Sequence, residues 1–333
     1  MSREKSPKSQ APKSKSAPPS DKQSERPAPS VRASLVALKP SRVPPPPFPF
    51  QARCSKNTKR LLAQGIDTVI VSPTASGKTV IAGHVIDDIP NDEVLSVSHS
   101  NPLCEQLEER LSPSATVQAV LAGWRPAKKP RLLIWDECHH SAADYWGTLR
   151  DIFPKVPLLG LTPCPQRADG RALGLFQEMV VAAHYSELMA EGIIAPCKVS
   201  GPEAVHEDKL PDPVKAYLRG GEGKKALFFL PDIAAAKDVT KRLERLKFKV
   251  GSYHSQMAKG MRHDMLQKFR DGEITIICAV DCLSEGIDVP DAHVGVLVQR
   301  CSGIAQYLNC VGRILRRAEG KKFSHLIDLR GAS

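Results

Sequence analysis

Short apolar runs alternate with longer amphipathic stretches along most of the chain. In the first half, runs bounded by turn residues have the continuous apolar character of strands that are buried on both faces of a sheet. The predicted strands are 67–72, 93–98, 131–135 and 157–162, and the predicted helices include 78–88 and 102–110. Strands that alternate with helices in this way predict an α/β fold built on a parallel sheet.

The same alternation starts again after the polar, proline-rich segment 200–214. This second set contains predicted strands 225–230, 249–254, 274–280, 294–299 and 324–329, and predicted helices 232–247, 258–270 and 304–316. We therefore expect two successive α/β lobes, one over residues 48–210 and one over residues 211–333.

The first 47 residues differ from the rest in composition. Residues 1–50 contain twelve prolines and ten serines, and six lysines and four arginines stand against three acidic residues, giving +7 of the chain's net charge of +11. A segment of this kind lacks the apolar surface needed to form a core. We expect residues 1–47 to be a disordered basic arm, which acts either as an electrostatic tether to nucleic acid or as a solubilising tail.

The composition also argues against several classes of protein. A hydrophobic fraction of 41% in 333 residues supports ordinary globular cores. The longest apolar runs fall well short of the roughly 20 residues that span a bilayer, so no membrane association is expected. The nine cysteines are scattered without zinc-type spacing, which favours reduced thiols in a cytoplasmic protein over a disulfide framework.

The segment "DECHH", residues 136–140, places five possible metal ligands in a row. Neighbouring side chains on an extended backbone point to opposite faces, so these five residues cannot close one zinc tetrahedron. Asp136 and Glu137 instead follow a predicted buried strand, at the sheet edge where α/β proteins bind ligands. One carboxylate could hold magnesium while the other activates a water, and the alternative is a solvated strand end.

A phosphate-binding loop is predicted between the first strand and the helix that follows it. The segment "SPTASGKT" has the required spacing, and its predicted nucleotide-binding residues are Ser72, Pro73, Thr74, Ala75, Ser76, Gly77, Lys78 and Thr79. Gly77 would let the backbone approach the phosphates, and Lys78 would neutralise their charge. Thr79 and Asp136 would hold Mg²⁺, with Glu137 polarising the attacking water. The two segments together predict a nucleotide hydrolase.

An ordered series of motifs resembles those of superfamily 2 helicases and translocases of the DEAD/DEAH-box-like kind, in particular the type III restriction, excision-repair and phage helicases. Besides "SPTASGKT" and "DECH", the segments are "FPFQAR" (48–53), "SHSNPLCEQL" (98–107), "GLTPCPQRADGRALG" (160–174), "AVDCLSEGIDVPDAHVGVLVQR" (279–300) and "YLNCVGRILRR" (307–317). The resemblance implies two tandem RecA-like lobes with ATP and Mg²⁺ in a cleft between them. It also implies that Gln51 reads adenine and that segment 98–107 grips a nucleic-acid strand.

The resemblance further assigns roles in the second lobe. Arg313 and Arg316 would stabilise charge on the transferring γ-phosphoryl group, and their spacing would place both on one face of the predicted helix. The alternative is that they belong to a solvated basic helix. Gly286 and Asp288 would join the loop of the second lobe that faces ATP.

The sequence departs from the family pattern at several positions. Residues 162–165 read Thr-Pro-Cys-Pro where the family has Thr-Ala-Thr-Pro, Ser100 stands at an arginine position, and Asn309 replaces a glutamine. Only 29 residues separate Gln106 from Asp136, which is expected to leave no room for a further strand and loop. His139 and His140 are either a link to the 162–165 segment or ordinary polar neighbours.

The sequence thus predicts an ATP-dependent helicase or translocase that acts on nucleic acid, on DNA in preference to RNA by family resemblance. Two alternatives stay open: a nucleic-acid-binding module whose ATPase has decayed, which the departures suggest, and the motor subunit of a restriction or repair assembly. The two lobes account for the residues after the arm, so we expect a protein partner to supply any wedge or nuclease.

Overall fold

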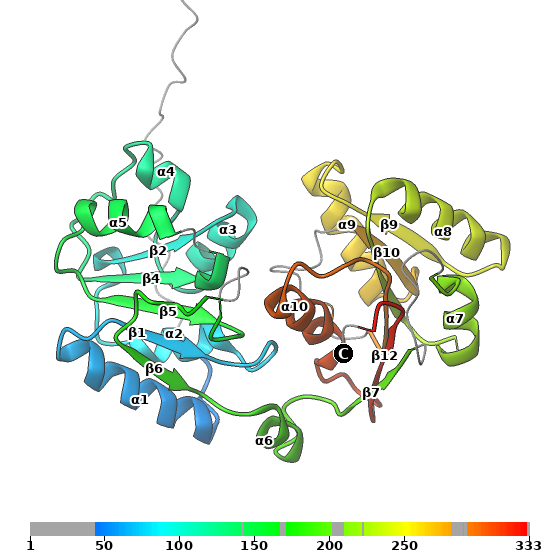
Figure 1. Cartoon of the computed structure of the whole chain (residues 1–333), viewed down its shortest axis with the longest axis horizontal. Helices are drawn as coiled ribbons and strands as arrows, with labels where there is room; N and C mark the ends of the chain where they lie inside the picture. Colours follow the sequence, from blue (N-terminus) through cyan, green and yellow to red (C-terminus); the bar gives the residue numbers. More distant parts are fainter. Residues whose placement is uncertain are drawn as a thin grey trace, which may run out of the picture. The chain divides into compact units, whose positions relative to one another are not determined.

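The computed structural model describes residues 44–140, 143–166, 171–201, 210–221, 223–280, 289 and 292–331 (Figure 1). The predicted basic arm lies outside these ranges except for residues 44–47. Every element described below belongs to the compact unit Pro40–Ser333. None of the helices in the described ranges is both long enough and apolar enough to cross a membrane.

The first lobe is built on a six-stranded sheet in which all strand pairs are parallel, with the order β3-β2-β4-β5-β1-β6. Its strands are β1 (Thr68–Val71), β2 (Val94–Ser98), β3 (Ser114–Thr116), β4 (Leu132–Asp136), β5 (Leu158–Thr162) and β6 (Glu178–Val181). Its helices are α1 (Pro49–Ala63), α2 (Lys78–Val85), α3 (Asn101–Arg110), α4 (Val117–Leu121), α5 (Ala143–Ile152) and α6 (Tyr185–Ala190), with the 3₁₀ turns η1 (Asn91–Glu93) and η2 (Cys138–His140).

The second lobe repeats this construction, with the parallel strand order β7-β12-β11-β8-β10-β9. Its strands are β7 (Cys197–Ser200), β8 (Ala226–Leu230), β9 (Val250–Tyr253), β10 (Ile276–Val280), β11 (Val294–Leu297) and β12 (Ser324–Asp328). Its helices are α7 (Pro213–Gly220), α8 (Ile233–Arg245), α9 (Lys259–Arg270) and α10 (Ile304–Leu315). The predicted α/β class and the two parallel-sheet lobes are confirmed.

Helices cover both faces of each sheet, which explains why the strands read as continuous apolar runs (Figure 1). In β1, for example, Val69 packs into one core of the first lobe and Ile70 into the other. The second lobe has the same arrangement, because Phe228 and Phe229 of β8 belong to cores on opposite faces of the sheet. The sheets are therefore fixed by burial on both sides.

Short and exposed elements were not predicted. The interval between Gln106 and Asp136 was expected to hold no further strand, and this expectation was wrong: it contains the three-residue β3 and the five-residue α4. The N-terminus of α4 is capped by Thr116, whose Oγ1 accepts a hydrogen bond from Ala119 N at 3.1 Å. Strand β7 precedes the predicted lobe boundary at residue 210 but pairs with β12.

Gly160 in the centre of β5 provides a test of this packing. A Cβ at this position would lie 2.3 Å from Phe176 Cζ and 3.0 Å from Cys138 Sγ. We expect Gly160→Ala to lower the free energy of unfolding by about 1–3 kcal/mol, because the core must shift to accept the methyl group. Urea unfolding followed by circular dichroism measures the change.

Gly260→Ala in α9 is the matched control, because nothing lies within 4 Å of its added Cβ. The control should be neutral or more stable by about 0.5–1 kcal/mol, since alanine replaces glycine in a helix. Equal stabilities for the two variants would contradict the close approach at β5.

Candidate nucleotide-binding site

The carboxyl ends of three adjacent strands bring the predicted site residues together. Strand β5 lies between β4 and β1, with Val71 opposite Thr162 and Asp136 opposite Leu161. The segments that follow these strands therefore meet at one edge of the sheet. Lys78 Nζ lies 3.8 Å from Glu137 Oε1, and both side chains are largely buried. The structure thus joins the phosphate-binding loop to the Asp-Glu pair, as the spacing predicted.

The loop between β1 and α2 is closed by its own hydroxyl groups. Ser76 Oγ donates to Pro73 O at 2.6 Å, so the 2.6 Å contact between Ser72 Oγ and Ser76 Oγ leaves Ser72 as the donor. Ala75 and Gly77 both adopt positive φ, at 70° and 83°. Helix α2 starts directly after Gly77, so its first amides point to the concave side of the loop, where anions bind.

Gln51 braces this loop from α1. Its side chain is only 3% exposed. Its Nε2 donates to Ser76 O at 2.8 Å, and its Oε1 accepts from Phe48 N at 2.9 Å. Both ends of the amide are engaged with backbone groups. The predicted reading of adenine by Gln51 stays a prediction, and the contacts identify Gln51 as a support for the loop.

The two carboxyl groups at the end of β4 lie in different environments. Burial raises the pKa of the Asp136 carboxyl to about 7, with the charge of Glu137 adding to the shift and Lys78 opposing it. Glu137 has φ of 52°, and its backbone N donates to Asp136 Oδ1 at 3.1 Å. Within the described structure, Glu137 Oε2 is buried and accepts no hydrogen bond.

These features fit a bound nucleotide and a divalent cation. A carboxyl whose pKa is raised by burial and by a like charge gains a counter-charge when a cation binds. Thr79, the second residue of α2, and Asp136 are the oxygen donors that could hold Mg²⁺, which usually takes one or two protein carboxylates together with phosphate oxygens. Glu137 Oε2, which accepts no hydrogen bond within the described structure, leaves an acceptor for a water.

The remaining residues of "DECHH" serve different purposes. Cys138 is fully buried in a core of the first lobe. His139 Nδ1 lies 3.1 Å from Thr162 Oγ1 and 3.4 Å from Glu137 Oε2. Thr162 Oγ1 donates its own proton to Cys164 O, so it accepts from His139. The ring of His140 lies against that of His99, with centroids 4.6 Å apart. His139 therefore connects the end of β4 to the 162–165 segment.

In the described ranges, no group of three or more His, Cys, Asp or Glu side chains is arranged to hold a metal ion. The candidate cation site therefore depends on Thr79, Asp136 and phosphate oxygens, and not on a side-chain cage.

The second-lobe residues are only partly described. Gly286 and Asp288 lie outside the described residues. Arg313 is 5% exposed in the last turn of α10. Arg316 follows the helix with φ −59° and ψ 139°, and its backbone bridges to Ile194. The helix predicted over 304–316 thus ends one residue earlier, with Arg316 as its C-cap, and the shared role of the two arginines stays a prediction.

Two side chains that the sequence did not indicate form hydrogen bonds with α10 or the residue after it. Thr74 Oγ1 of the phosphate-binding loop donates to Leu308 O at 2.7 Å. Lys321 is 3% exposed, and its Nζ donates to Ala292 O at 2.5 Å, to Arg316 O at 2.9 Å and to Ile314 O. A buried ammonium on these carbonyls fixes the end of α10. An isolated lysine carries no sequence signal for such a role.

Comparison with known proteins shows which proteins this chain resembles. Residues 209–318 match the family model described as "Helicase conserved C-terminal domain". A "51.5 kDa protein" of a Lactococcus phage (isolate 7-9) is 24% identical, covering 78% of this chain and 65% of its own length. The DNA 3'-5' translocase XPB2 of Sulfurisphaera tokodaii is also 24% identical, covering 75% of each chain.

Among solved structures, a fragment described as an HsdR subunit of a type I restriction enzyme from Vibrio vulnificus superposes with a TM-score of 0.68 at 20% identity, covering 86% of this chain and 64% of that chain. Residues 209–318 therefore carry a helicase C-terminal domain, and the two lobes have the RecA-like fold. It spans about two thirds of the length of the phage relative and of the HsdR fragment.

Gly77 provides a test of the loop geometry. Its φ is 83°, and an added Cβ would lie 2.7 Å from Gln51 Nε2, which braces the loop. We expect Gly77→Ala to weaken binding of a fluorescent ATP analogue by at least about tenfold. The left-handed backbone costs alanine about 1–2 kcal/mol, and the added Cβ would also displace the Gln51 amide from its hydrogen bond to Ser76 O. A fluorescence titration measures the affinity.

Gly65→Ala is the control, because Gly65 has φ of 74° but nothing within 4 Å of its added Cβ. This variant should lose similar stability from backbone strain and keep its nucleotide affinity. If both variants lose nucleotide affinity equally, the effect comes from general destabilisation and the proposed brace is wrong.

Proposed function

We propose that this protein is an ATP-dependent helicase or translocase that acts on nucleic acid, with DNA as the favoured substrate. The observation that carries the proposal is the approach of Lys78 to Glu137 at 3.8 Å across the carboxyl edge of the first sheet. That pairing places a phosphate-binding cation beside a carboxylate that can activate water. The similarity to a protein named as a DNA translocase supports DNA over RNA.

Each residue of the first lobe has a distinct part in the proposed reaction. The amides at the start of α2 and Lys78 bind the phosphates, and the Gln51 brace holds the loop in shape. Thr79 and Asp136 would hold Mg²⁺, which would neutralise phosphate charge. Glu137 Oε2 accepts a hydrogen bond from the attacking water and orients it toward the γ-phosphorus.

The state of Glu137 is coupled to the 162–165 segment through His139. The Nδ1 of His139 reaches both Glu137 Oε2 and Thr162 Oγ1. When hydrolysis changes the hydrogen bonding of Glu137, the imidazole must adjust, and Thr162 must adjust with it. The departure from the family pattern at residues 162–165 therefore lies beside the hydrogen bond of Thr162 to His139, whose Nδ1 is 3.4 Å from Glu137 Oε2.

The second lobe supplies the remaining charge in this proposal. Arg313 acts on the γ-phosphoryl group, and the hydrogen bond from Thr74 to Leu308 supports a role for α10 beside the phosphate-binding loop. Arg316, Gly286 and Asp288 stay predictions for the same site. The basic segment 1–47 would add electrostatic attraction to nucleic acid, a protein partner would supply a wedge or nuclease, and the setting would be a reducing cytoplasm.

Two substitutions test the hydrolytic assignment. Lys78→Ala and Glu137→Gln should each lower kcat for ATP by at least about 10²–10³-fold, because each removes a charge that acts on the transition state. Steady-state phosphate release with single-stranded DNA, duplex DNA or RNA measures the effect and ranks the substrates.

Lys56→Ala is the matched control, because Lys56 is an exposed lysine on α1, and this variant should hydrolyse ATP at the wild-type rate. Wild-type turnover in Lys78→Ala or Glu137→Gln would overturn the site. Binding of nucleic acid by a wild-type protein without any ATPase activity would favour the alternative of a decayed motor.

Arg313 is tested separately, because its role depends on charge in the transition state. Arg313→Lys should lower kcat by about 10³-fold or more while the affinity for ATP changes little, since lysine lacks the planar fork of arginine. Arg317→Ala, which removes an exposed arginine just beyond α10, is the control. A variant that loses ATP affinity and kcat in proportion would place Arg313 in ground-state binding instead.

A further inference from the structure

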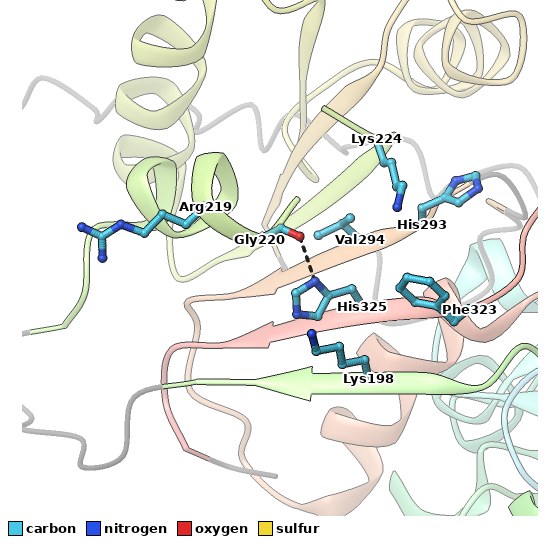
Figure 2. Close-up of a pocket in the computed structure, with 8 residues that line it drawn as sticks. All are labelled: Lys198, Arg219, Gly220, Lys224, His293, Val294, Phe323 and His325. Carbon is cyan, nitrogen blue, oxygen red and sulfur yellow. Dashed lines mark hydrogen bonds between the residues drawn. The ribbon is translucent and has the colours of Figure 1, made fainter. Parts of the chain in front are cut away.

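A basic cavity lies at the amino-terminal edge of the second sheet (Figure 2). Its volume is about 130 Å³, and it is lined by Lys198, Arg219, Lys224, His293, Phe323 and His325 together with two small or apolar residues. The site takes no part in the proposed hydrolysis. Its composition therefore calls for a separate explanation.

The floor of the cavity is rigid. Lys198, His325 and Val294 are register partners across β7, β12 and β11, so their side chains share one face of the sheet. His325 Nδ1 donates to Gly220 O at 2.9 Å, as Figure 2 shows, and His325 Nε2 shares a hydrogen bond of 2.7 Å with Ser200 Oγ. Both ring nitrogens are thus hydrogen-bonded, and these two contacts fix the orientation of the imidazole.

The wall of the cavity presents an aromatic ring beside a cation. Phe323 is 44% exposed. The residue after it, Ser324, begins β12, and the backbone N of Ser324 donates to Pro196 O at 2.7 Å. Lys224 Nζ lies 5.2 Å from the centroid of the Phe323 ring. The backbone of Lys224 is held by Tyr217 Oη, which donates to Lys224 O at 2.7 Å. The backbone segments that carry the exposed ring and the neighbouring lysine are therefore both held by hydrogen bonds.

The charge of the cavity favours an anion. The ammonium groups of Lys198 and Lys224 extend into the region around His325 and Phe323, whereas Arg219 points away from them (Figure 2). None of the lining residues, all of which the structure describes, is acidic. Concave positive surface concentrates anions, and the two lysines have phosphate as a natural counter-ion.

The exposed Phe323 ring distinguishes between the classes of anion that could bind in the cavity. Proteins that bind single strands combine cations that contact the phosphate backbone with aromatic side chains on which bases stack. An acidic peptide would pair with the lysines but leave the exposed Phe323 ring in water. A nucleotide unit within a strand satisfies both features together.

The cavity lies on a different face of the sheet from the proposed catalytic arginine. Helix α7, which carries Gly220, packs into the core that contains Val294 and Ile327. Helix α10, which carries Arg313, packs into the core on the opposite face. The two features are separated by the thickness of the sheet, so the cavity is not an extension of the nucleotide site.

We propose that this cavity is an additional binding site for single-stranded nucleic acid, with a base stacked on Phe323 and flanking phosphates bound by Lys198 and Lys224. The inference rests on the proposed function in one respect, namely that the protein acts on nucleic acid. It does not depend on ATP hydrolysis.

The test uses the full chain and a fluorescein-labelled oligo(dT) strand, with affinity measured by anisotropy over a series of salt concentrations without ATP. The double variant Lys198→Ala/Lys224→Ala should lower the slope of log affinity against log salt by about 0.7 for each lost phosphate contact. Lys237→Ala/Lys241→Ala removes the same charge from exposed positions on α8 and should leave the slope unchanged.

The ring is tested alone. Phe323→Ala should weaken oligo(dT) binding by about fivefold or more at one salt concentration, because a stacked base is lost. Phe323→Tyr keeps the ring and should restore the affinity. Photocrosslinking with a strand that contains 5-iodouracil should attach to the segment around Phe323.

Four outcomes would overturn the inference. If the wild-type protein binds oligo(dT) and its ATPase is stimulated by DNA, but the cavity variants bind equally well, the cavity proposal fails and the proposed function stands. If the wild-type protein neither binds nor is stimulated by any nucleic acid, the proposed function fails first. Loss of polyglutamate binding alone in the double variant would assign an acidic peptide. Displacement by thymidine monophosphate at equal nucleotide concentration would assign a free nucleotide.

Discussion

The first lobe depends on the parallel pairing of β5 between β4 and β1. Because Gly160 has no side chain, Phe176 and Cys138 pack directly against the backbone of β5. The registers of β5 with its two neighbours set Val71 opposite Thr162 and Asp136 opposite Leu161. The three strands therefore end at one level. Lys78 and Glu137 meet as a result, although they are far apart in sequence. The chemistry of the site is thus a consequence of strand register, and local sequence supplies only the side chains.

Hydrogen bonds from neutral side chains hold the loop that the register positions. Two residues of this loop, Ala75 and Gly77, have positive φ, and for alanine this conformation is strained. Ser72 stands where the general pattern has a glycine, but its hydroxyl joins that of Ser76 and stabilises the turn. Gln51 adds a bond from outside the loop. The departures from the simplest phosphate-loop sequence are therefore compensated by contacts and leave the amides at the start of α2 available for an anion.

Sequence patterns predicted the elements whose signal is local. Strands buried on both faces have continuous apolar runs, and α8 has a capping residue, since Asp232 Oδ1 accepts from Ala235 N at 2.8 Å. The pairing of Lys78 with Glu137 could be predicted from motif spacing. In contrast, β3, β6 and β7 are short strands, each partly exposed, so their composition carries no periodicity. The end of α10 could not be predicted either, because it is fixed by Lys321 and by a bridge to Ile194. These contacts link residues that only the fold brings together.

The two proposed binding sites differ in the source of their positive charge. At the carboxyl edge of the first sheet, α2 begins at the site, and its free amides and dipole favour phosphate. At the amino edge of the second sheet, α7 ends at Gly220, and a helix C-terminus carries partial negative charge that disfavours an anion. Binding there must come from the ammonium groups of Lys198 and Lys224 and from the ring of Phe323. Mobile ammonium groups hold a phosphate loosely and without fixed geometry. A surface of this kind suits a strand that moves past the protein, whereas the rigid amides of the first site suit a nucleotide that must be held for reaction.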